Sequence, residues 1–318
     1  YRDPRLTWRY VSEPQQFLKG RRIPVPRGRV VGGSSAVNSM VYLRGQPADY
    51  DSWAAAGAEG WDFESCLPYF RRSETSDTGA NHYRGDSGPL SVEFGKLQSP
   101  IFDAFFSSAS NAGHKISDDL NGEQASGFAR LQATKRKGKR CSSATAYLFP
   151  ALNRPNLELL TDTLVTKVIF DGSRATSIKI AIGRETHEIH AEREIILAGG
   201  SINSPQLLML SGIGPGDQLK RHGISPVVDL PGVGANLQDH VDVMLSYPTI
   251  GKHSIAYLKN PLRQLKAGVE WILTGGGIAA SNIFEVGGFL KSESDIDRDN
   301  LQVHLAPVSF TEQGDRFV

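Results

Sequence analysis

The chain of 318 residues is long enough for one large domain or for two of ordinary size. Hydrophobic residues make up 39% of it and charged residues 22%, as is usual for soluble proteins, and no apolar run reaches the ~18 residues that would predict a membrane span. Because the net charge is +1, we expect no general affinity for nucleic acid or anionic membranes. Two cysteines, Cys66 and Cys141, exclude a disulfide framework and a cysteine-rich metal site, and they fit a reducing compartment.

The first residues, YRDPRLTWRY, are polar and loop-like and lack an initiating Met. They do not resemble a natural N-terminus, so we expect the chain to be an internal piece of a longer protein. The compartment is therefore left open between the cytoplasm, the mitochondrion and the periphery of a membrane.

The first half of the chain predicts helices separated by glycine-rich turns, beginning with a glycine-rich stretch from Pro26 to Gly45. Residues 48–74 place apolar and aromatic side chains between charged ones, and residues 100–112 place apolar side chains four apart, so both predict helices. Residues 82–92 predict a turn and then a strand. The basic run 135–140 (KRKGKR) is short, and we interpret it as a solvated turn.

The second half predicts a meander of short strands, followed by a switch to alternating strands and helices. The strands expected from apolar or β-branched runs are 157–160, 165–170, 175–182, 186–190, 195–197, 227–230, 243–247 and 301–305. After the turn at Gly199 and Gly200, Ser204 and Pro205 predict the start of a helix that ends before Gly212. Residues 262–273 predict a further helix.

Several short motifs carry no function alone. Gly232-Val233-Gly234 lacks the third glycine of a dinucleotide-binding fingerprint. The run from Gly32 to Ala36 (GGSSA) is similar to a nucleophile elbow, but Ala36 stands where the elbow needs Gly, and no clear His–acid pair completes a hydrolase triad. The eight histidines show no metal-ligand spacing, so we expect no metal site.

Taken together, the glycine-rich stretches resemble the glucose–methanol–choline (GMC) oxidoreductase family along the whole chain. PRGRVVGGSSAVNSMVYLRGQPADYDSW, residues 26–53, resembles the first family signature. AGGSINSPQLLMLSGIGP, residues 198–215, resembles the second, and LPGVGANLQDH, residues 230–240, is similar to the segment that closes the second FAD-binding stretch.

The resemblance implies an α/β fold in which an FAD-binding domain, built on a mostly parallel sheet, is interleaved with a substrate domain built on an antiparallel sheet with helices. The FAD-binding domain is expected to comprise residues 1–95 and 156–240, and the substrate domain residues 96–155 and 241–318. The family's N-terminal GxGxxG unit has no counterpart in the chain, and its catalytic His, with a neighbouring His or Asn, would follow Val318. No catalytic residue is therefore expected within the chain, which we expect to be inactive alone.

The cofactor implied is FAD, and the resemblance assigns residues to it position by position. The loop along the flavin and pyrophosphate corresponds to Arg27, Gly28, Val30, Val31, Gly32, Gly33 and Ser34. The stretch facing the isoalloxazine corresponds to Asn38, Ser39, Met40 and Val41, and the adenosine end to Val165, Gly199 and Gly200. Some family members bind flavin covalently through a His near this loop; here those positions are Ser35, Ala36 and Val37, so we expect non-covalent FAD.

The implied activity is oxidation of a primary alcohol, aliphatic or choline-like, by hydride transfer to flavin, with electrons passed to a quinone or another electron carrier. Asp242 stands where choline enzymes have a Glu, so it is either a head-group ligand or an ordinary surface residue. A fatty-acid photodecarboxylase is an alternative: Cys141 after Arg140 fits it, but Leu160 stands where its second Arg is expected. A non-catalytic flavin-fold protein is the third.

Overall fold

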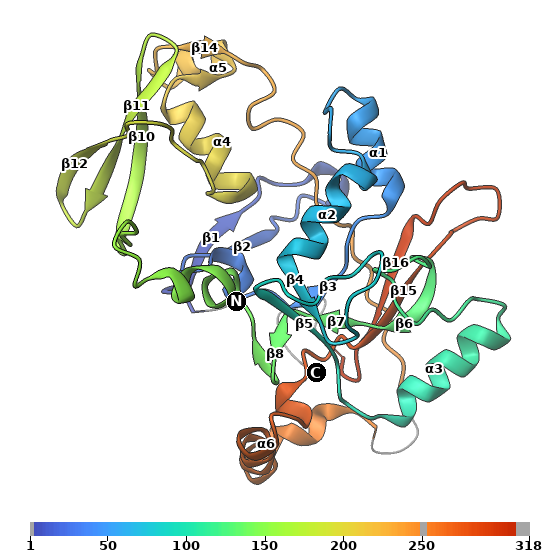
Figure 1. Cartoon of the computed structure of the whole chain (residues 1–318). Coiled ribbons are helices and arrows are strands. Elements are labelled where there is room, and N and C mark those ends of the chain that lie inside the picture. The colour runs from blue at the N-terminus through green and yellow to red at the C-terminus, as the bar shows by residue number, and fades with distance from the viewer. Residues whose placement is uncertain (1–2, 249–252, 310–318) are drawn as a thin grey trace. The chain divides into compact units, whose positions relative to one another are not determined.

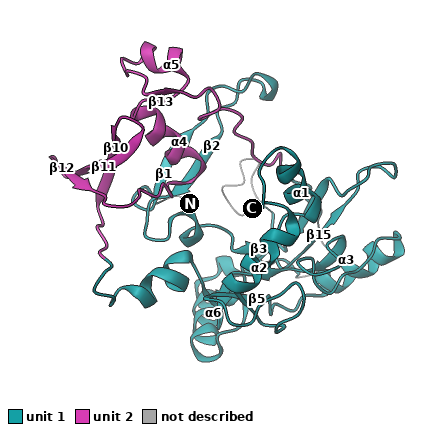
Figure 2. Cartoon of the chain, turned by 45° about the horizontal axis from the view of Figure 1, so that its top comes forward, with its two compact units in different colours: residues 1–157, 244–318 teal, residues 158–243 magenta. Residues whose placement is uncertain are grey.

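The computed structural model describes residues 3–248 and 253–309. The chain forms two compact units, drawn in teal and magenta in Figure 2. Unit 1 comprises Tyr1–Leu157 and Met244–Val318, and unit 2 comprises Glu158–Val243. Each unit has its own sheets and helices, and the two are described in turn.

In unit 1 the described residues form four sheets (Figure 1), with strand orders β1-β2, β3-β7-β5-β4, β16-β15-β6 and β8-β9. The bounds are β1 Thr7–Val11, β2 Pro24–Gly28, β3 Val41–Tyr42, β4 Glu74–Ser76, β5 Leu90–Phe94, β6 Gly127–Arg130, β7 Gln132–Ala133, β8 Lys135–Arg136, β9 Lys139–Arg140, β15 Val286–Leu290 and β16 Leu301–Leu305. Strands β4 and β5 pair in parallel, and the other pairs are antiparallel. Strands β6 and β7 are nearly continuous and link two of the sheets.

A small apolar core forms around this link. Leu120, Ala129 and Leu131 are buried together, and Val41, Leu43 and Phe289 pack against them. Because Val41 belongs to β3 and Leu131 lies between β6 and β7, burial of these side chains fixes β3 against the sheet. Each fully buried aliphatic side chain contributes about 1.5–3 kcal/mol.

The described part of unit 1 contains four helices and six short helical turns, several of which begin at capping residues. They are α1 Pro47–Ala55, α2 Phe63–Ser73, α3 Pro100–Asn111 and α6 Pro261–Thr274, with short helical turns η1 Gln16–Leu18, η2 Gly33–Ala36, η3 Ala144–Leu148, η4 Phe149–Ala151, η5 Ile255–Lys259 and η6 Ile278–Ala280. Asp62 caps α2 by accepting a 2.9 Å hydrogen bond from the Ser65 N–H, and Asn260 caps α6 in the same way. Gly275, at φ +63°, ends α6.

Unit 2 is built on a three-stranded antiparallel meander, β10-β11-β12. Its elements are β10 Thr163–Asp171, β11 Arg174–Ile182, β12 Glu185–His190, α4 Gly200–Leu210, β13 Ile213–Gly214, α5 Gly216–Arg221 and β14 Val228–Asp229, and β13 pairs with β14 in parallel. The Ser211 hydroxyl, at the end of α4, accepts a 2.8 Å hydrogen bond from the Val168 N–H of β10. This bond holds α4 against the meander.

The main helices and strands are confirmed, but several predicted boundaries are wrong. Residues 48–74 are largely helical, as predicted, and form two helices because the chain turns at Gly57 and Gly60, where φ is +102° and +78°. Helix α4 starts at Gly200, five residues before the predicted start. Pro205 therefore lies inside the helix, beyond its first turn.

Three predicted strands, 157–160, 195–197 and 243–247, are irregular in the structure. Ile196 is 79% exposed. A short apolar run becomes a strand only where a neighbouring strand offers hydrogen bonds. None of the described residues supplies that neighbour to these three runs. None of the helices described in residues 3–248 and 253–309 is long and apolar enough to cross a membrane.

Candidate functional site

The loop from Gly28 to Ala36 in unit 1 folds tightly because its glycines permit close backbone contacts. A Cβ at Gly28 would lie 2.3 Å from the carbonyl oxygen of Gly33, a distance that no other residue could tolerate. Gly32 and Gly33 have φ values of +92° and +55°, which favour glycine. The Gly28 N–H donates a 3.0 Å hydrogen bond to the Ser34 hydroxyl and closes the loop at its base.

One face of this loop is open. A Cβ at Gly33 would meet no atom within 4 Å. Among the described residues, no acceptor binds the backbone N–H groups of Val31 and Gly32. Unhindered main chain with unused donors is a surface on which a planar, polar cofactor can pack. The residues present therefore fit a bound flavin nucleotide.

Two serines hold the loop in this shape from within unit 1. The Ser35 hydroxyl donates to the Gly32 carbonyl at 2.6 Å and lies 2.9 Å from the Ser143 hydroxyl. The Ser143 hydroxyl lies 3.1 Å from the same carbonyl, and the backbone N–H of Ser143 donates a 2.9 Å hydrogen bond to the Ser35 hydroxyl. With its hydroxyl used in this way, Ser35 is part of the loop's support and does not form the nucleophile of a hydrolase elbow.

The stretch from Asn38 to Val41 follows this loop and is fixed in a rare backbone conformation. Met40 has a φ of +64°, which is unusual for a residue with a side chain. Its N–H donates to the Asn38 side-chain oxygen at 3.1 Å, and its carbonyl accepts from the Thr134 N–H at 2.9 Å. Asn282 donates to the Ser39 carbonyl at 3.0 Å. The structure therefore brings both predicted flavin-facing segments together in unit 1.

The sequence did not single out Ser143, Thr134 and Asn282 as supporting residues, and it contains no local signal for them. Each lies in a different part of the chain from the segment it supports. Arg140 stands beside Cys141 in the sequence, but nothing local predicts its contact with Asn38, at 2.8 Å. The interpretation of residues 135–140 as a solvated turn is wrong in part. They form the β8–β9 hairpin, in which Lys135 is only 3% exposed.

A buried ionic cluster holds the chain that follows residues 38–41, the stretch predicted to face the flavin. Arg84 donates to Glu74 at 2.8 Å and to Asp119 at 2.6 Å, and Arg44 lies 2.9 Å from Glu74. The side chains of Glu74 and Arg84 are fully buried. Because Arg44 follows β3 by two residues, this cluster anchors the chain leaving Val41.

Burial and charge shift the pKa values of this cluster. Burial, with the Glu74 carboxylate nearby, raises the pKa of Tyr42 to about 12. Burial alone would raise the pKa of Glu74, but hydrogen bonds and charge from Arg84 and the charge of Arg44 lower it below its ordinary value. Glu74 is therefore ionised at neutral pH and paired with two arginines.

In unit 2 the predicted adenosine-end residues lie on β10 and at the start of α4. Val165 lies in β10 next to an irregularity in the pairing with β11. Gly199 is the N-cap of α4, and Gly200 is its first residue, with a φ of +82°. Asp242 lies in an irregular, exposed segment. The structure gives it no partner among the described residues.

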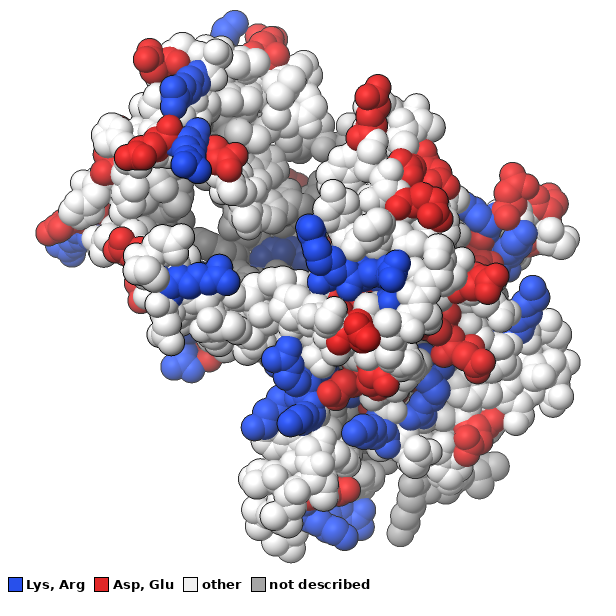
Figure 3. Space-filling view, viewed as in Figure 1, with Lys and Arg blue, Asp and Glu red and all other residues white. Residues whose placement is uncertain are grey.

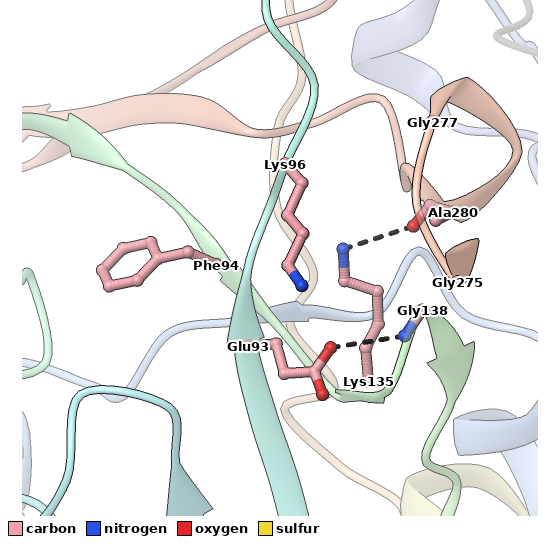
Figure 4. Close-up of a pocket in the computed structure, with 8 residues that line it drawn as sticks. All are labelled: Glu93, Phe94, Lys96, Lys135, Gly138, Gly275, Gly277 and Ala280. Atoms are coloured by element: carbon pink, nitrogen blue, oxygen red, sulfur yellow. Dashed lines mark hydrogen bonds between the residues drawn. The ribbon is translucent and has the colours of Figure 1, made fainter. Parts of the chain in front are cut away.

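Two cavities of unit 1 lie away from these predicted site residues. One of about 10 Å³, room for roughly one water molecule, is lined by Lys135, Glu93 and residues of the turn before η6 (Figure 4). There the Lys135 ammonium donates to the Ala280 carbonyl at 3.3 Å, and burial lowers its pKa. A shallower, polar groove of about 270 Å³ is lined by Arg71, Arg72 and residues 84–87, among others. None of the residues lining either cavity is a predicted site residue.

The face drawn in Figure 3 carries no single dominant charge. Basic and acidic side chains lie interspersed on it. In the described part of the chain, His, Cys, Asp and Glu form no group of three that could hold a metal ion.

The chain matches the family described as GMC oxidoreductase over residues 15–242, which is more than half of its length. The chain belongs to the GMC oxidoreductase family. It is 44% identical to the mitochondrial choline dehydrogenase of Homo sapiens over 312 residues, covering 98% of the chain and 52% of that protein. It is 43% identical to the oxygen-dependent choline dehydrogenase of Brucella anthropi over 307 residues, covering 96% of the chain and 56% of that protein. The chain thus spans about half the length of these curated GMC relatives.

Solved GMC-type structures share the fold. An FAD-dependent oxidoreductase from Chaetomium thermophilum superposes with a TM-score of 0.80 at 30% identity, covering 90% of the chain and 53% of that protein. A pyridoxine 4-oxidase superposes with a TM-score of 0.68 at 32% identity, covering 71% of the chain and 45% of that protein. The predicted α/β fold class is confirmed.

Proposed function

We propose that the full-length protein is an FAD-dependent oxidoreductase that oxidises a primary alcohol, and that this chain supplies the main-chain surface against which the flavin packs. The observation that carries the proposal is the open face of Gly33, beside the unused N–H groups of Val31 and Gly32. Relatives at 43–44% identity named choline dehydrogenase support the reaction class.

Bound FAD would accept the hydride and pass the electrons on, and the residues of this chain position it. In this proposal the loop from Arg27 to Ser34 lies along the flavin and pyrophosphate, and Asn38 to Val41 face the isoalloxazine. Val165, Gly199 and Gly200 contact the adenosine end. The assignment of residues 1–95 and 156–240 to FAD binding, and of 96–155 and 241–318 to the substrate domain, belongs to the same proposal.

The FAD is proposed to be bound without a covalent link. No His occupies Ser35, Ala36 or Val37, and the Ser35 hydroxyl is already hydrogen-bonded to Gly32 and Ser143. Acid precipitation of the holoenzyme would test this directly. Flavin released into the supernatant supports the proposal, whereas flavin that stays with the pellet contradicts it.

The proposed substrate is a small primary alcohol, either aliphatic or choline-like, and the proposed acceptor is a quinone or another electron carrier. A choline-like substrate carries a quaternary ammonium, which a carboxylate such as Asp242 would attract. The general base that takes the alcohol proton is proposed to lie beyond Val318. The chain on its own is therefore proposed to be inactive and to bind FAD poorly.

The structure gives no specific support to the photodecarboxylase alternative. The Cys141 thiol is buried and accepts a 3.4 Å hydrogen bond from the Ser91 N–H, as expected of a residue that packs a sheet. Leu160 is 46% exposed and offers no cation for a carboxylate.

The test is the reductive half-reaction of the full-length holoenzyme. Choline, a series of straight-chain primary alcohols and a secondary alcohol would be added anaerobically in the dark while the visible absorbance of the oxidised flavin is followed. Bleaching by at least one primary alcohol and not by the secondary alcohol supports the proposal. A flavin that none of them reduces contradicts it.

A further inference from the structure

We infer that Arg140 is a positioning residue that fixes the orientation of the Asn38 side chain, so that Asn38 can only donate hydrogen bonds to the bound flavin. This inference rests on the proposed function. It states the direction of one hydrogen bond at the proposed site, in which Asn38 is the donor and the flavin the acceptor. It follows from the hydrogen bonds around Asn38 and Arg140 and from the exposure of the Asn38 side chain.

The oxygen of the Asn38 side chain is fully engaged. It accepts a 3.1 Å hydrogen bond from the Met40 N–H and a 2.8 Å hydrogen bond from the Arg140 guanidinium. An amide oxygen has two lone pairs, so these two donors use its acceptor capacity. The alternative orientation would point the amide NH2 group at both donors, and it is therefore excluded.

The nitrogen of the same amide is left for a ligand. The Asn38 side chain is exposed, and among the described residues its NH2 group meets no acceptor. Since the oxygen faces the protein, the NH2 group faces away from it. A group presented in this way recognises a carbonyl oxygen or an unprotonated ring nitrogen, and it cannot accept a hydrogen bond from an N–H group of the ligand.

Arg140 is itself held in place. The same guanidinium nitrogen that contacts Asn38 also donates to the Ser35 carbonyl at 3.1 Å. One cation thus joins the β8–β9 hairpin to both flavin-facing segments. Without it the Asn38 side chain would keep only the Met40 contact, and its amide could rotate. Arg136, on the same hairpin, contacts the Pro89 carbonyl at 2.6 Å instead and provides a matched control.

Four substitutions separate the role of the Asn38 amide from the role of Arg140. Asn38→Asp keeps an oxygen for Met40 and Arg140 and adds an ion pair with Arg140, but it removes the NH2 donor. Arg140→Met removes the positioning cation and leaves Asn38 intact, while Arg136→Met removes an equal charge from the same hairpin. Arg140→Lys retains a donor for Asn38.

The experiment measures the FAD dissociation constant of full-length apo-protein by quenching of FAD fluorescence, together with thermal unfolding of each apo-variant. We expect Asn38→Asp to weaken FAD binding roughly tenfold without loss of apo-protein stability, because a hydrogen bond is replaced by two facing acceptors. Arg140→Met should weaken it about threefold to tenfold, Arg140→Lys less, and Arg136→Met by no more than about twofold.

Unchanged FAD affinity in Asn38→Asp would overturn the inference, as would equal affinities in Arg140→Met and Arg136→Met. If Arg140→Met fails to fold, Asn38→Asp decides, since its contacts to the protein are preserved. Wild-type protein that binds no FAD would instead overturn the proposed function itself, and the inference with it.

Discussion

The hydroxyl oxygens of Ser35 and Ser143 lie 2.9 Å apart, although 108 residues separate them along the chain. Both hydroxyls also reach the carbonyl of Gly32, at 2.6 Å and 3.1 Å. The glycine loop is therefore not shaped by its own sequence alone. A distant segment that begins η3 holds it in the conformation that leaves one face open.

This relationship predicts that Ser143→Ala weakens both the fold and flavin retention. The substitution removes the Ser143 hydroxyl, which lies 3.1 Å from the Gly32 carbonyl and 2.9 Å from the Ser35 hydroxyl, and should cost about 1 kcal/mol in the free energy of unfolding. FAD affinity should fall a few-fold, as measured by fluorescence titration of the full-length apo-protein. Ser107→Ala is the control, because Ser107 is exposed on α3 and its hydroxyl has no partner in the described structure. Identical FAD affinities in the two variants would show that the serine pair does not support the site.

Gly33→Leu should abolish flavin retention in the full-length protein, since its side chain would enter the open space proposed for the cofactor. Gly172→Leu is a closely matched control: φ is +55° at Gly33 and +58° at Gly172, and a Cβ meets no atom within 4 Å at either. Both substitutions should cost about 1–2 kcal/mol through the left-handed backbone. Only Gly33→Leu should yield colourless protein. A fully yellow Gly33→Leu protein would show that the flavin does not pack on this loop.

Much of the local structure could be predicted, because certain residues determine the backbone conformation of the few positions around them. Pro100 and Pro261 mark helix starts, Gly212 and Gly275 mark helix ends, and Asp171-Gly172 marks the turn between β10 and β11. These signals depend on backbone geometry that a proline or glycine fixes locally. The glycine loop is also recognisable as a distinct segment, because its pattern is local.

The remainder depends on contacts between distant residues. Residues 195–197 can form a strand only if another strand lies beside them and offers hydrogen bonds. Their own sequence does not encode the presence of that strand. In the same way Arg140 belongs to a basic run in the sequence, and only folding brings it 2.8 Å from Asn38. Placement of Val165, Gly199 and Gly200 against the cofactor stays a prediction, as does a contact of Asp242 with a substrate head group and the role of every other site residue.

Glu74→Gln should destabilise the full-length protein strongly, because it leaves buried Arg44 without its carboxylate partner and leaves Arg84 with Asp119 as its remaining carboxylate partner. Removing one partner of a buried ion pair costs roughly 3–5 kcal/mol. The free energy of unfolding in urea at pH 7 would be compared with that of Glu64→Gln, whose carboxylate is exposed on α2. A loss no larger than in Glu64→Gln would mean that the cluster contributes little.

The difference in unfolding free energy between wild type and Glu74→Gln should depend on pH in a defined way. The folded state lowers the pKa of Glu74 below its ordinary value of 4.5, so its stabilising contribution is complete above that value. It is lost as the pH falls through the lowered pKa, where the native carboxylate takes up a proton. The stability difference between wild type and Glu74→Gln should therefore be constant near neutrality and narrow only in acid. A difference that instead narrows between pH 6 and 8, roughly the range where His titrates, would contradict the assignment to Glu74.

Asp242→Asn should lower the catalytic efficiency with choline more than that with an uncharged alcohol of similar size. A carboxylate ~4 Å from a quaternary ammonium contributes about 1 kcal/mol in water and more where it is shielded, which corresponds to a loss of about fivefold or more. Steady-state kinetics of the full-length enzyme would give both values, with Asp295→Asn as a control for the loss of one exposed charge. Equal effects on the two substrates would assign Asp242 to the surface alone.

The proposed oxidation of an alcohol with FAD is tested most directly by one paired measurement on the full-length holoenzyme. One sample is incubated anaerobically in the dark with choline and straight-chain primary alcohols, and a second is illuminated with blue light in the presence of a long-chain fatty acid. Because Leu160 supplies no cation to hold a carboxylate, we expect flavin bleaching and aldehyde formation in the dark sample and no hydrocarbon in the illuminated one. Hydrocarbon and CO2 formed only in light, with no alcohol reducing the flavin in the dark, would contradict it.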